Sequence, residues 1–239
     1  MRVAEAIKTW MMELGLHADD RLPGEAELMA RFSMSKGTIR EATRILEAQG
    51  LVRTRTGPGG GTFVAQMSDE RARALLSNYV YFQGLTIQDI YQLRRVLEPE
   101  MAAGLAGHLS EAQLAELESV MDAYAAPAQT PDQERAQHVA SLEFHRKLAE
   151  MSGNRLMGLI VGFIATALSD LTVYRQLYDP PNPALWERGL AYQRDLIDAL
   201  RTGQPEAARR IMAAHMATAE TLMTQQQAEV LRRFMAPAP

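Results

Sequence analysis

The order of elements in the first 65 residues constrains the fold more than any other feature of the chain. Apolar residues recur at helical spacing from Arg2 to Leu14, and further helices are predicted over Glu25–Phe32 and Lys36–Gln49. The β-rich strings LVRTRT and TFVA follow, joined by the glycine-rich segment Gly57–Gly61. Two such strings around a glycine turn indicate a β-hairpin. Helix, helix, short turn, helix and hairpin is the order of a winged helix-turn-helix.

The pattern changes after about residue 67, where strand signals vanish. Helical patterns follow over residues 69–82, 86–106, 110–126, 132–152, 154–177, 184–202 and 204–234, with breaks at glycine and proline clusters. A run of about seven helices predicts an all-α bundle. We therefore expect a mainly α chain, with a winged helix-turn-helix domain at 1–66 and an all-α domain for effector binding and dimerisation at 67–239.

Composition narrows the class of protein. The chain has 239 residues and no cysteine, which excludes disulfides and thiolate metal sites and suits a reducing cytoplasm. No apolar run approaches about 20 residues, and no basic segment followed by an apolar stretch opens the chain. These features predict a cytoplasmic protein without a membrane segment.

Charge is distributed unevenly. The formal net charge of the chain is −4, yet the segment from Arg31 to Arg55 holds six basic and two acidic residues. Within it Lys36, Arg40 and Arg44 recur at i, i+4 and i+8, so a helix stacks three cations on one stripe. Like charges at this spacing oppose helix formation by roughly 0.2–0.5 kcal/mol per pair. Either this is a solvated charged face or a polyanion lies against it.

The helix from Lys36 is placed as a recognition helix. Lys36 and Thr38 in its first turn suit base edges, whereas Arg40 and Arg44 suit flanking phosphates. Gly37 is a poor helix former, which is tolerable if the backbone must approach DNA closely. The predicted DNA-binding residues are Ser35, Lys36, Gly37, Thr38, Arg40, Arg44, Arg53, Arg55, Gly59 and Gly60. The alternatives are an exposed helix with scattered cations and a nucleic-acid binder without sequence specificity.

The segment GPGGGT could be mistaken for a nucleotide-binding loop. A P-loop needs a Lys-Ser/Thr pair after its last glycine, and a dinucleotide fingerprint opens a helix. Here Thr62-Phe63 and a β-string follow. A wing tip fits better, with Arg53 and Arg55 as phosphate partners.

These residues carry a family resemblance. The segment RLPGEAELMARFSMSKGTIREATRILEAQGLVRTRTGPGGGTFV (Arg21 to Val64) resembles the winged-helix domain of the GntR family of bacterial transcription regulators. The strings IYQLRRVLEPEMAAGLA and FHRKLAEMSGN are similar to the ligand-sensing domain of its FadR subfamily. The resemblance implies a homodimeric, ligand-responsive repressor or activator, not an enzyme, that binds a pseudo-palindromic double-stranded operator.

Three positions depart from the family pattern. Ala26 replaces an arginine that often contacts DNA, and Gly24 replaces a serine. Lys36 replaces an arginine and so loses the planar fork for bidentate contacts. We expect an operator unlike the usual one of the family.

The resemblance also raises the question of a divalent metal. Many members of the subfamily hold an ion with one aspartate and three histidines, at positions occupied here by Ser141, His145, Gln193 and His215. A hydroxyl and an amide are poor substitutes for a carboxylate and an imidazole. His138 shares the face of His145, but two turns, about 10 Å, separate the two. No cofactor is therefore expected; His145 and His215 are the ligands if an ion is present.

A pocket for an organic effector is the alternative. By the same resemblance, Ser141, His145, Asn154, Gln193 and His215 line that pocket, and Arg94 receives a carboxylate of the effector. A plain surface salt bridge between Arg94 and Glu98, at i+4, competes with that role. The rival function is a helical-bundle metalloprotein or enzyme that uses His145 and His215 and carries a DNA-binding appendage.

Overall fold

The computed structural model describes residues 2–66, 68–81 and 83–235. The chain divides into two compact units, residues 1–72 and 73–239. The boundary lies inside helix α4 (Asp69–Tyr81), a few residues beyond the expected division at 66/67. Residue 82, with which the predicted 69–82 helix ends, and residue 67 lie outside the described residues.

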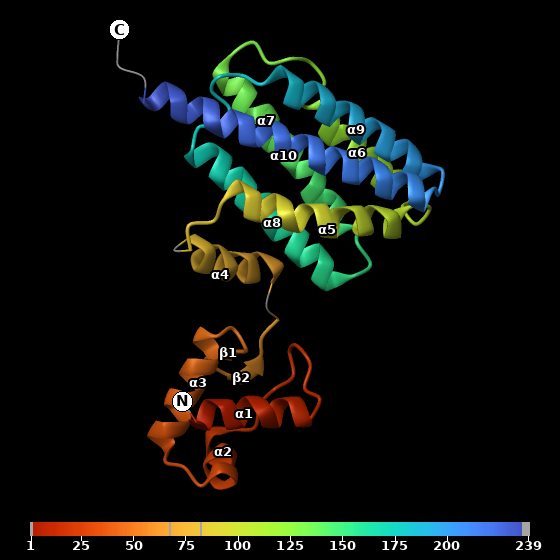
Figure 1. Cartoon of the computed structure of the whole chain (residues 1–239). Coiled ribbons are helices and arrows are strands. Elements are labelled where there is room, and N and C mark those ends of the chain that lie inside the picture. The colour runs from red at the N-terminus through yellow and green to blue at the C-terminus, as the bar shows by residue number, and fades with distance from the viewer. Residues whose placement is uncertain (1, 67, 82, 236–239) are drawn as a thin grey trace. The chain divides into compact units, whose positions relative to one another are not determined.

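The first unit has the predicted element order (Figure 1). Its elements are α1 (Arg2–Glu13), α2 (Glu25–Phe32), α3 (Lys36–Ala48), β1 (Val52–Arg55) and β2 (Gly61–Val64). The two strands pair antiparallel, with Val52 opposite Val64 and Arg55 opposite Gly61. The mainly helical fold with a small hairpin is thus confirmed.

One apolar face of α3 forms the centre of the core of this unit. Ile39, Ala42 and Leu46 are buried against residues of α1 and α2, including Ile7 and Leu28. The helix is amphipathic, so burial of this face directs the opposite, cationic stripe to solvent. The core therefore decides which side chains of α3 are available to a partner.

The tip of the hairpin depends on its glycines. Gly57, Gly59 and Gly61 have positive φ angles of 90°, 76° and 152°. A Cβ atom on Gly60 would lie 2.6 Å from the carbonyl oxygen of Arg55. Residues with a side chain would strain this backbone, so the composition of the turn already has a structural explanation.

The second unit is all-α. Besides its part of α4 it contains α5 (Ile87–Leu105), α6 (Glu111–Asp122), α7 (Pro131–Glu150), α8 (Arg155–Tyr174), α9 (Pro183–Arg201) and α10 (Pro205–Met235). The predicted helices are found, with most ends displaced by one to three residues. The largest difference is at α6, which ends at Asp122 instead of residue 126; there the chain turns and buries Tyr124.

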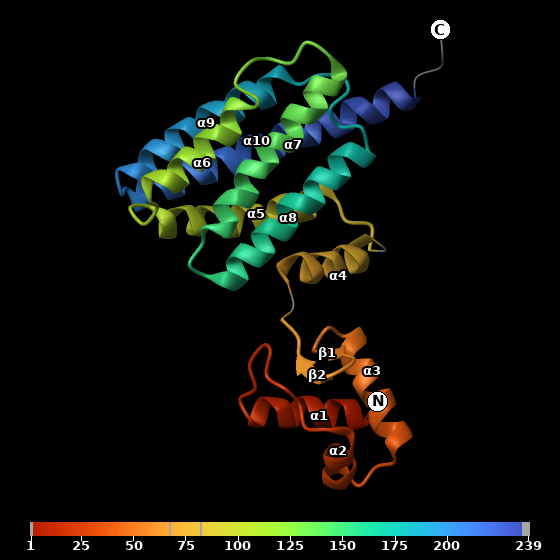
Figure 2. The same ribbon diagram turned by 180° about the vertical axis from the view of Figure 1, so that it is seen from behind.

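Within this unit α10 packs against α5 and α9, and α7 packs against α6 and α8 (Figures 1 and 2). Helix α8 is long and apolar enough to cross a bilayer, with a mean hydropathy of 1.9 over its most apolar window. A core helix of a soluble bundle has the same signature, and α8 buries Val161, Ile164 and Leu168 against its neighbours.

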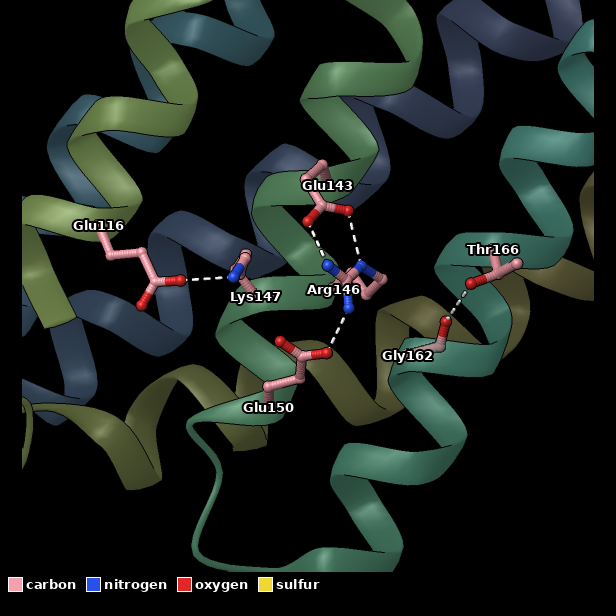
Figure 3. Close-up of polar contacts among 7 residues, drawn as sticks. All are labelled: Glu116, Glu143, Arg146, Lys147, Glu150, Gly162 and Thr166. Atoms are coloured by element: carbon pink, nitrogen blue, oxygen red, sulfur yellow. Dashed lines mark hydrogen bonds and ion pairs between the residues drawn. The ribbon is translucent and has the colours of Figure 1, made fainter. Parts of the chain in front are cut away.

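Helix α7 presents two chemically different faces. On the outer face Arg146 pairs with Glu143 and Glu150, and Lys147 pairs with Glu116 of α6 (Figure 3). Partly exposed pairs of this kind contribute about 0–1 kcal/mol each. The rotation of α7 is set by its opposite face, which buries Leu142, Phe144 and Leu148.

Candidate functional site

The start of α3 carries the first group of predicted site residues. Ser35 is the N-cap, and its Oγ accepts a hydrogen bond from the backbone N–H of Thr38 at 3.3 Å. Its predicted contact with DNA thus competes with a capping role, which is worth about 1 kcal/mol. Lys36 remains 60% exposed at its side chain.

Glu25, the first residue of α2, was not anticipated as part of this surface. It accepts a hydrogen bond from Arg40 Nε at 2.7 Å and lies 3.6 Å from the Nζ of Lys36. The hydrogen bond from Arg40 holds the pKa of Glu25 below its usual value. Glu25 thereby offsets the repulsion within the cationic stripe, whereas Arg44 is exposed and has no ion pair among the described residues.

A groove connects the stripe to the hairpin. Arg40 and Arg44 line it on the side of α3, and Thr54, Gly61 and Thr62 line it on the side of the strands. Helix and hairpin therefore share one concave surface of the first unit, as a wing that joins a recognition helix requires.

The backbone of α3 is open at Gly37. A Cβ atom there would meet only the Oγ of Ser35, at 3.9 Å, and the residue is exposed. Nothing in the packing of the free protein requires glycine at this position, although glycine weakens the helix.

The hairpin arginines are partly engaged. Arg53 pairs with Asp19, and the guanidinium of Arg55 lies 4.9 Å above the ring of Phe63. The carbonyl oxygen of Gly60 accepts a hydrogen bond from Arg21 Nη2 at 2.7 Å. Exposed pairs are weak, so both arginines can exchange these partners for phosphates.

The second unit contains a cavity on the inner face of α7. Ser141, His145 and His215 line it, together with Arg94 of α5. Its interior volume is about 40 Å³, room for a few water molecules. An organic effector can therefore enter only if the surrounding helices give way.

A buried ionic network stands at one end of this cavity. Arg94 donates to Glu98 through Nε and, at 3.4 Å, through Nη2, and the exposures of the two residues are 2% and 1%. The Nδ1 of His145 lies 2.6 Å from the second oxygen of Glu98. The i, i+4 pair considered from the sequence exists, but it is buried, so the alternative of a plain surface salt bridge is wrong.

Burial and the contacts within this network determine the protonation states of Glu98, His145 and His215. Burial alone would raise the pKa of Glu98, yet the Arg94 guanidinium and His145 hold that pKa well below its usual value. Burial lowers the pKa of His145 and that of His215. At neutral pH the network therefore comprises one cation, one carboxylate and neutral imidazoles, so His145 donates from Nδ1 and keeps Nε2 as an acceptor.

His215 completes this end of the cavity through its ring faces. Its centroid lies 5.1 Å from that of His145, and Tyr192 stacks on it at 5.4 Å. No group of three or more histidine, cysteine, aspartate or glutamate side chains able to hold a metal occurs among the described residues. Two imidazoles and the hydroxyl of Ser141 are a poor donor set for a divalent ion.

Two predicted pocket residues lie elsewhere, which corrects the sequence-based set. Gln193 is fully buried but does not line the cavity, because its amide is engaged by the hydroxyl of Tyr124 and the carbonyl of Ser141. Asn154 is exposed, and its Oδ1 accepts from the backbone of Leu156 at the start of α8. Its side chain is a helix cap.

The cavity also has lining residues that sequence reasoning did not predict. They include Tyr124, Glu134, Gln137 and Trp186. Glu134 and Gln137 precede His138 and Ser141 on α7 at helical spacing, so extending that stripe toward the N-terminus could have found them. Tyr124 and Trp186 come from a turn and from α9, and no local pattern marks them.

His138 predicts a pH dependence of stability. It lines the cavity with its Nε2 3.5 Å from Thr172 Oγ1, and burial lowers its pKa to about 4. The unfolded chain binds a proton near pH 6.5 but the folded chain does not, so stability is lost as the pH falls below that value. Between about pH 7 and about pH 5 this histidine should cost about 2 kcal/mol.

Urea unfolding at both pH values measures this loss. The variant His138→Gln should lose less stability on acidification than the wild type, while His108→Gln, at an exposed position, should behave as the wild type does. An equal loss in His138→Gln and wild type would contradict the assignment.

Two parts of the chain match known protein families. Residues 1–64 match the bacterial regulatory proteins of the gntR family, and residues 89–218 match the FCD domain. The HTH-type transcriptional repressor NanR of Salmonella schwarzengrund is 27% identical over 206 residues, which cover 82% of this chain and 73% of the relative. The relative of the same name from Salmonella typhimurium is equally similar.

Comparison with solved structures also finds GntR-family proteins. The Streptococcus agalactiae GntR structure superposes with a TM-score of 0.60 at 25% identity, covering 92% of this chain and 98% of that one. A GntR-family regulator from Pseudomonas syringae shares the fold, with a TM-score of 0.50 at 19% identity and coverage of 98% and 87%. The FCD domain alone spans more than half of the sequence. This chain therefore belongs to the GntR family of bacterial transcription regulators, with an FCD domain as its ligand-sensing part.

Proposed function

We propose that this protein binds a double-stranded operator with α3 and the hairpin, and that a small carboxylate in the FCD cavity changes its affinity for that operator. One observation carries the proposal: Arg40 and Arg44 of α3 line one groove together with residues of the hairpin strands. In the proposed complex Lys36 and Thr38 contact base edges, and Arg40 and Arg44 contact phosphates.

Glu25 belongs to this mechanism. In the free protein its carboxylate forms ion pairs with Lys36 and Arg40. In the proposed complex, DNA phosphates replace Glu25 as the partner of these two cations. The exchange is favourable because an exposed pair is worth little, whereas phosphate contacts also release condensed counterions. A pseudo-palindromic operator then requires a second copy of the chain, so we include a homodimer in the proposal.

The effector proposal rests on the cavity. Arg94, together with the imidazoles of His145 and His215, makes one end attractive to a carboxylate, without a metal ion. Because the interior offers only about 40 Å³, an effector must push apart α5, α7, α9 or α10. Displacement of packed helices is a physical route from the cavity to a change in operator affinity.

The rival function, a helical enzyme, is not favoured by any observation. The relatives of this chain are transcriptional regulators. Among the described residues no hydrogen bond joins a hydroxyl to His145 or His215, as an activated nucleophile would need. We therefore propose a non-enzymatic regulator that acts in the cytoplasm.

Replacing Lys36 by alanine tests base recognition. The loss of one base-edge contact should weaken operator binding by about 1–3 kcal/mol and relax discrimination at a single base position. Fluorescence anisotropy with a set of operator variants measures both effects. Lys8→Ala, on α1, is the matched control, since Lys8 pairs with Glu5 of its own helix. An equal loss of affinity for all sequences would show that Lys36 contacts phosphate only.

Replacing Gly37 by alanine separates stability from DNA binding. A methyl group meets no obstacle in the free protein, so α3 should gain up to about 1 kcal/mol. The same methyl group should hinder close approach to the duplex and weaken operator binding. Thermal unfolding and anisotropy on the same sample measure the two effects. Gly104→Ala, in α5, is the control. Unchanged operator affinity of the Gly37 variant would exclude close backbone contact.

The role of Arg94 needs a paired substitution. Arg94→Ala alone would leave the carboxylate of Glu98 buried without its partner, at a cost of about 3–5 kcal/mol. Arg94→Met combined with Glu98→Gln removes both charges and keeps an amide oxygen that can accept the hydrogen bond from His145 Nδ1. This double variant should bind operator as the wild type does but should no longer release it on addition of carboxylates.

The probes are small mono- and dicarboxylates that release operator from the wild type. Arg95→Met is the matched control, because Arg95 is the exposed neighbour that pairs with Glu220. If the double variant released DNA at the same carboxylate concentration as the wild type, the ionic network would not be the anchor.

A further inference from the structure

One buried acceptor in the second unit has no protein partner. Oε1 of Gln137 is the buried side-chain polar atom for which the described residues supply no hydrogen bond. A buried unsatisfied acceptor costs about 1–3 kcal/mol, so native proteins rarely keep one without a use. Gln137 lines the cavity and belongs to none of the roles assigned above.

The amide of Gln137 is held in place by its other end. Its Nε2 donates to the carbonyl oxygen of Ala126, in the segment between α6 and α7. That bond distinguishes the nitrogen from the oxygen, so the oxygen remains as the free acceptor. The side chain is therefore fixed in the wall of the cavity and has one unused function, to accept a hydrogen bond.

The surroundings of Gln137 make this part of the cavity complementary to a donor. Glu134, one turn earlier on α7, also lines the cavity, and one of its carboxylate oxygens already accepts from the backbone N–H of Asn182 at 3.0 Å. His138 is neutral at pH 7, because burial lowers its pKa to about 4. Gln137 and Glu134 thus contribute an acceptor and a negative charge to this part of the cavity. Arg94, the cation among the described lining residues, is paired with Glu98, although its charge also helps to lower the pKa of His138.

The two ends of the cavity differ in polarity and in position. Gln137 and His145 are separated by eight residues of α7, an axial rise of about 12 Å. Arg94 and the imidazole of His215 are at the His145 end. A molecule that extends along α7 between these ends meets a cation at one and an acceptor at the other.

We infer that the effector is a carboxylate that carries a hydrogen-bond donor, a hydroxyl or an ammonium group, at the end remote from its carboxylate, and that Gln137 selects for this donor. The inference rests on the proposed function, since the carboxylate end is anchored at Arg94. A site with a fixed acceptor discriminates against the analogue without the donor, because that analogue leaves the acceptor buried and unpaired.

A series of straight-chain monocarboxylates tests this inference, each in an unsubstituted form, with a terminal hydroxyl and with a terminal ammonium. The readout is the rise in melting temperature of the full chain. In the wild type a donor-bearing form should stabilise the protein more than the unsubstituted form of the same length, by a factor of roughly ten or more in apparent affinity.

Three variants test whether the side chain of Gln137 causes the preference for donor-bearing carboxylates. Gln137→Met should abolish it while keeping the response to unsubstituted carboxylates. Gln137→Glu keeps an acceptor but loses the hydrogen bond to the Ala126 carbonyl, so it should keep a weaker preference that is shifted toward the ammonium forms. Gln88→Met, at an exposed position of α5, should respond as the wild type does.

The results distinguish failure of the donor inference from failure of the proposed effector class. If the wild type responds equally to all three forms, or if Gln137→Met keeps the preference, the donor inference is wrong and the carboxylate anchor stands. If no carboxylate in any form shifts the melting temperature, the proposed effector class and the inference built on it are both overturned.

Discussion

The second unit depends on the buried contact of Arg94, Glu98 and His145. Removing charges from water is costly, and such a network is tolerated only when each member is paired. Here one carboxylate satisfies a guanidinium and an imidazole from two helices, α5 and α7. The same pairing leaves one end of a small cavity with a cation and neutral imidazoles. In the proposed function, stability and recognition of the effector therefore depend on the same atoms, and a ligand that redistributes these charges would also affect how the two helices pack.

On the proposed DNA-binding surface, a carboxylate also pairs with cations, but there the pairs are exposed to solvent. Glu25 holds Lys36 and Arg40 in place, as Glu98 holds Arg94, but exposure makes the pairs weak and exchangeable. In the proposed complex, phosphates displace Glu25 as the partner of these cations. Gly37 and the glycines of the hairpin tip contribute in different ways. The tip glycines are required by the backbone of the turn, whereas Gly37 is required by nothing inside the free protein.

Local patterns predicted most of the fold, because helical periodicity and glycine or proline breaks are local properties. The helix starting at Lys36 and the hairpin around Gly57–Gly61 were placed to within a residue or two. The cavity was harder to predict from the sequence. Its ionic network was visible as an i, i+4 pair, but its burial depends on α7 and α10 packing over it, which no local pattern encodes. Gln193 and Asn154 were misplaced for the same reason: partners from other segments, or the backbone of the next helix, had already engaged their amides.

Resonances of the imidazole nitrogens, measured by NMR on the full chain bound to operator, test the central claim most directly. When a carboxylate is added at the concentration that releases operator, the account predicts shifts at His145 and His215, which line the cavity. No shift is predicted at the exposed residues His17 and His108. Release of operator without any change at His145 and His215 would contradict it, because the effector would then bind somewhere else.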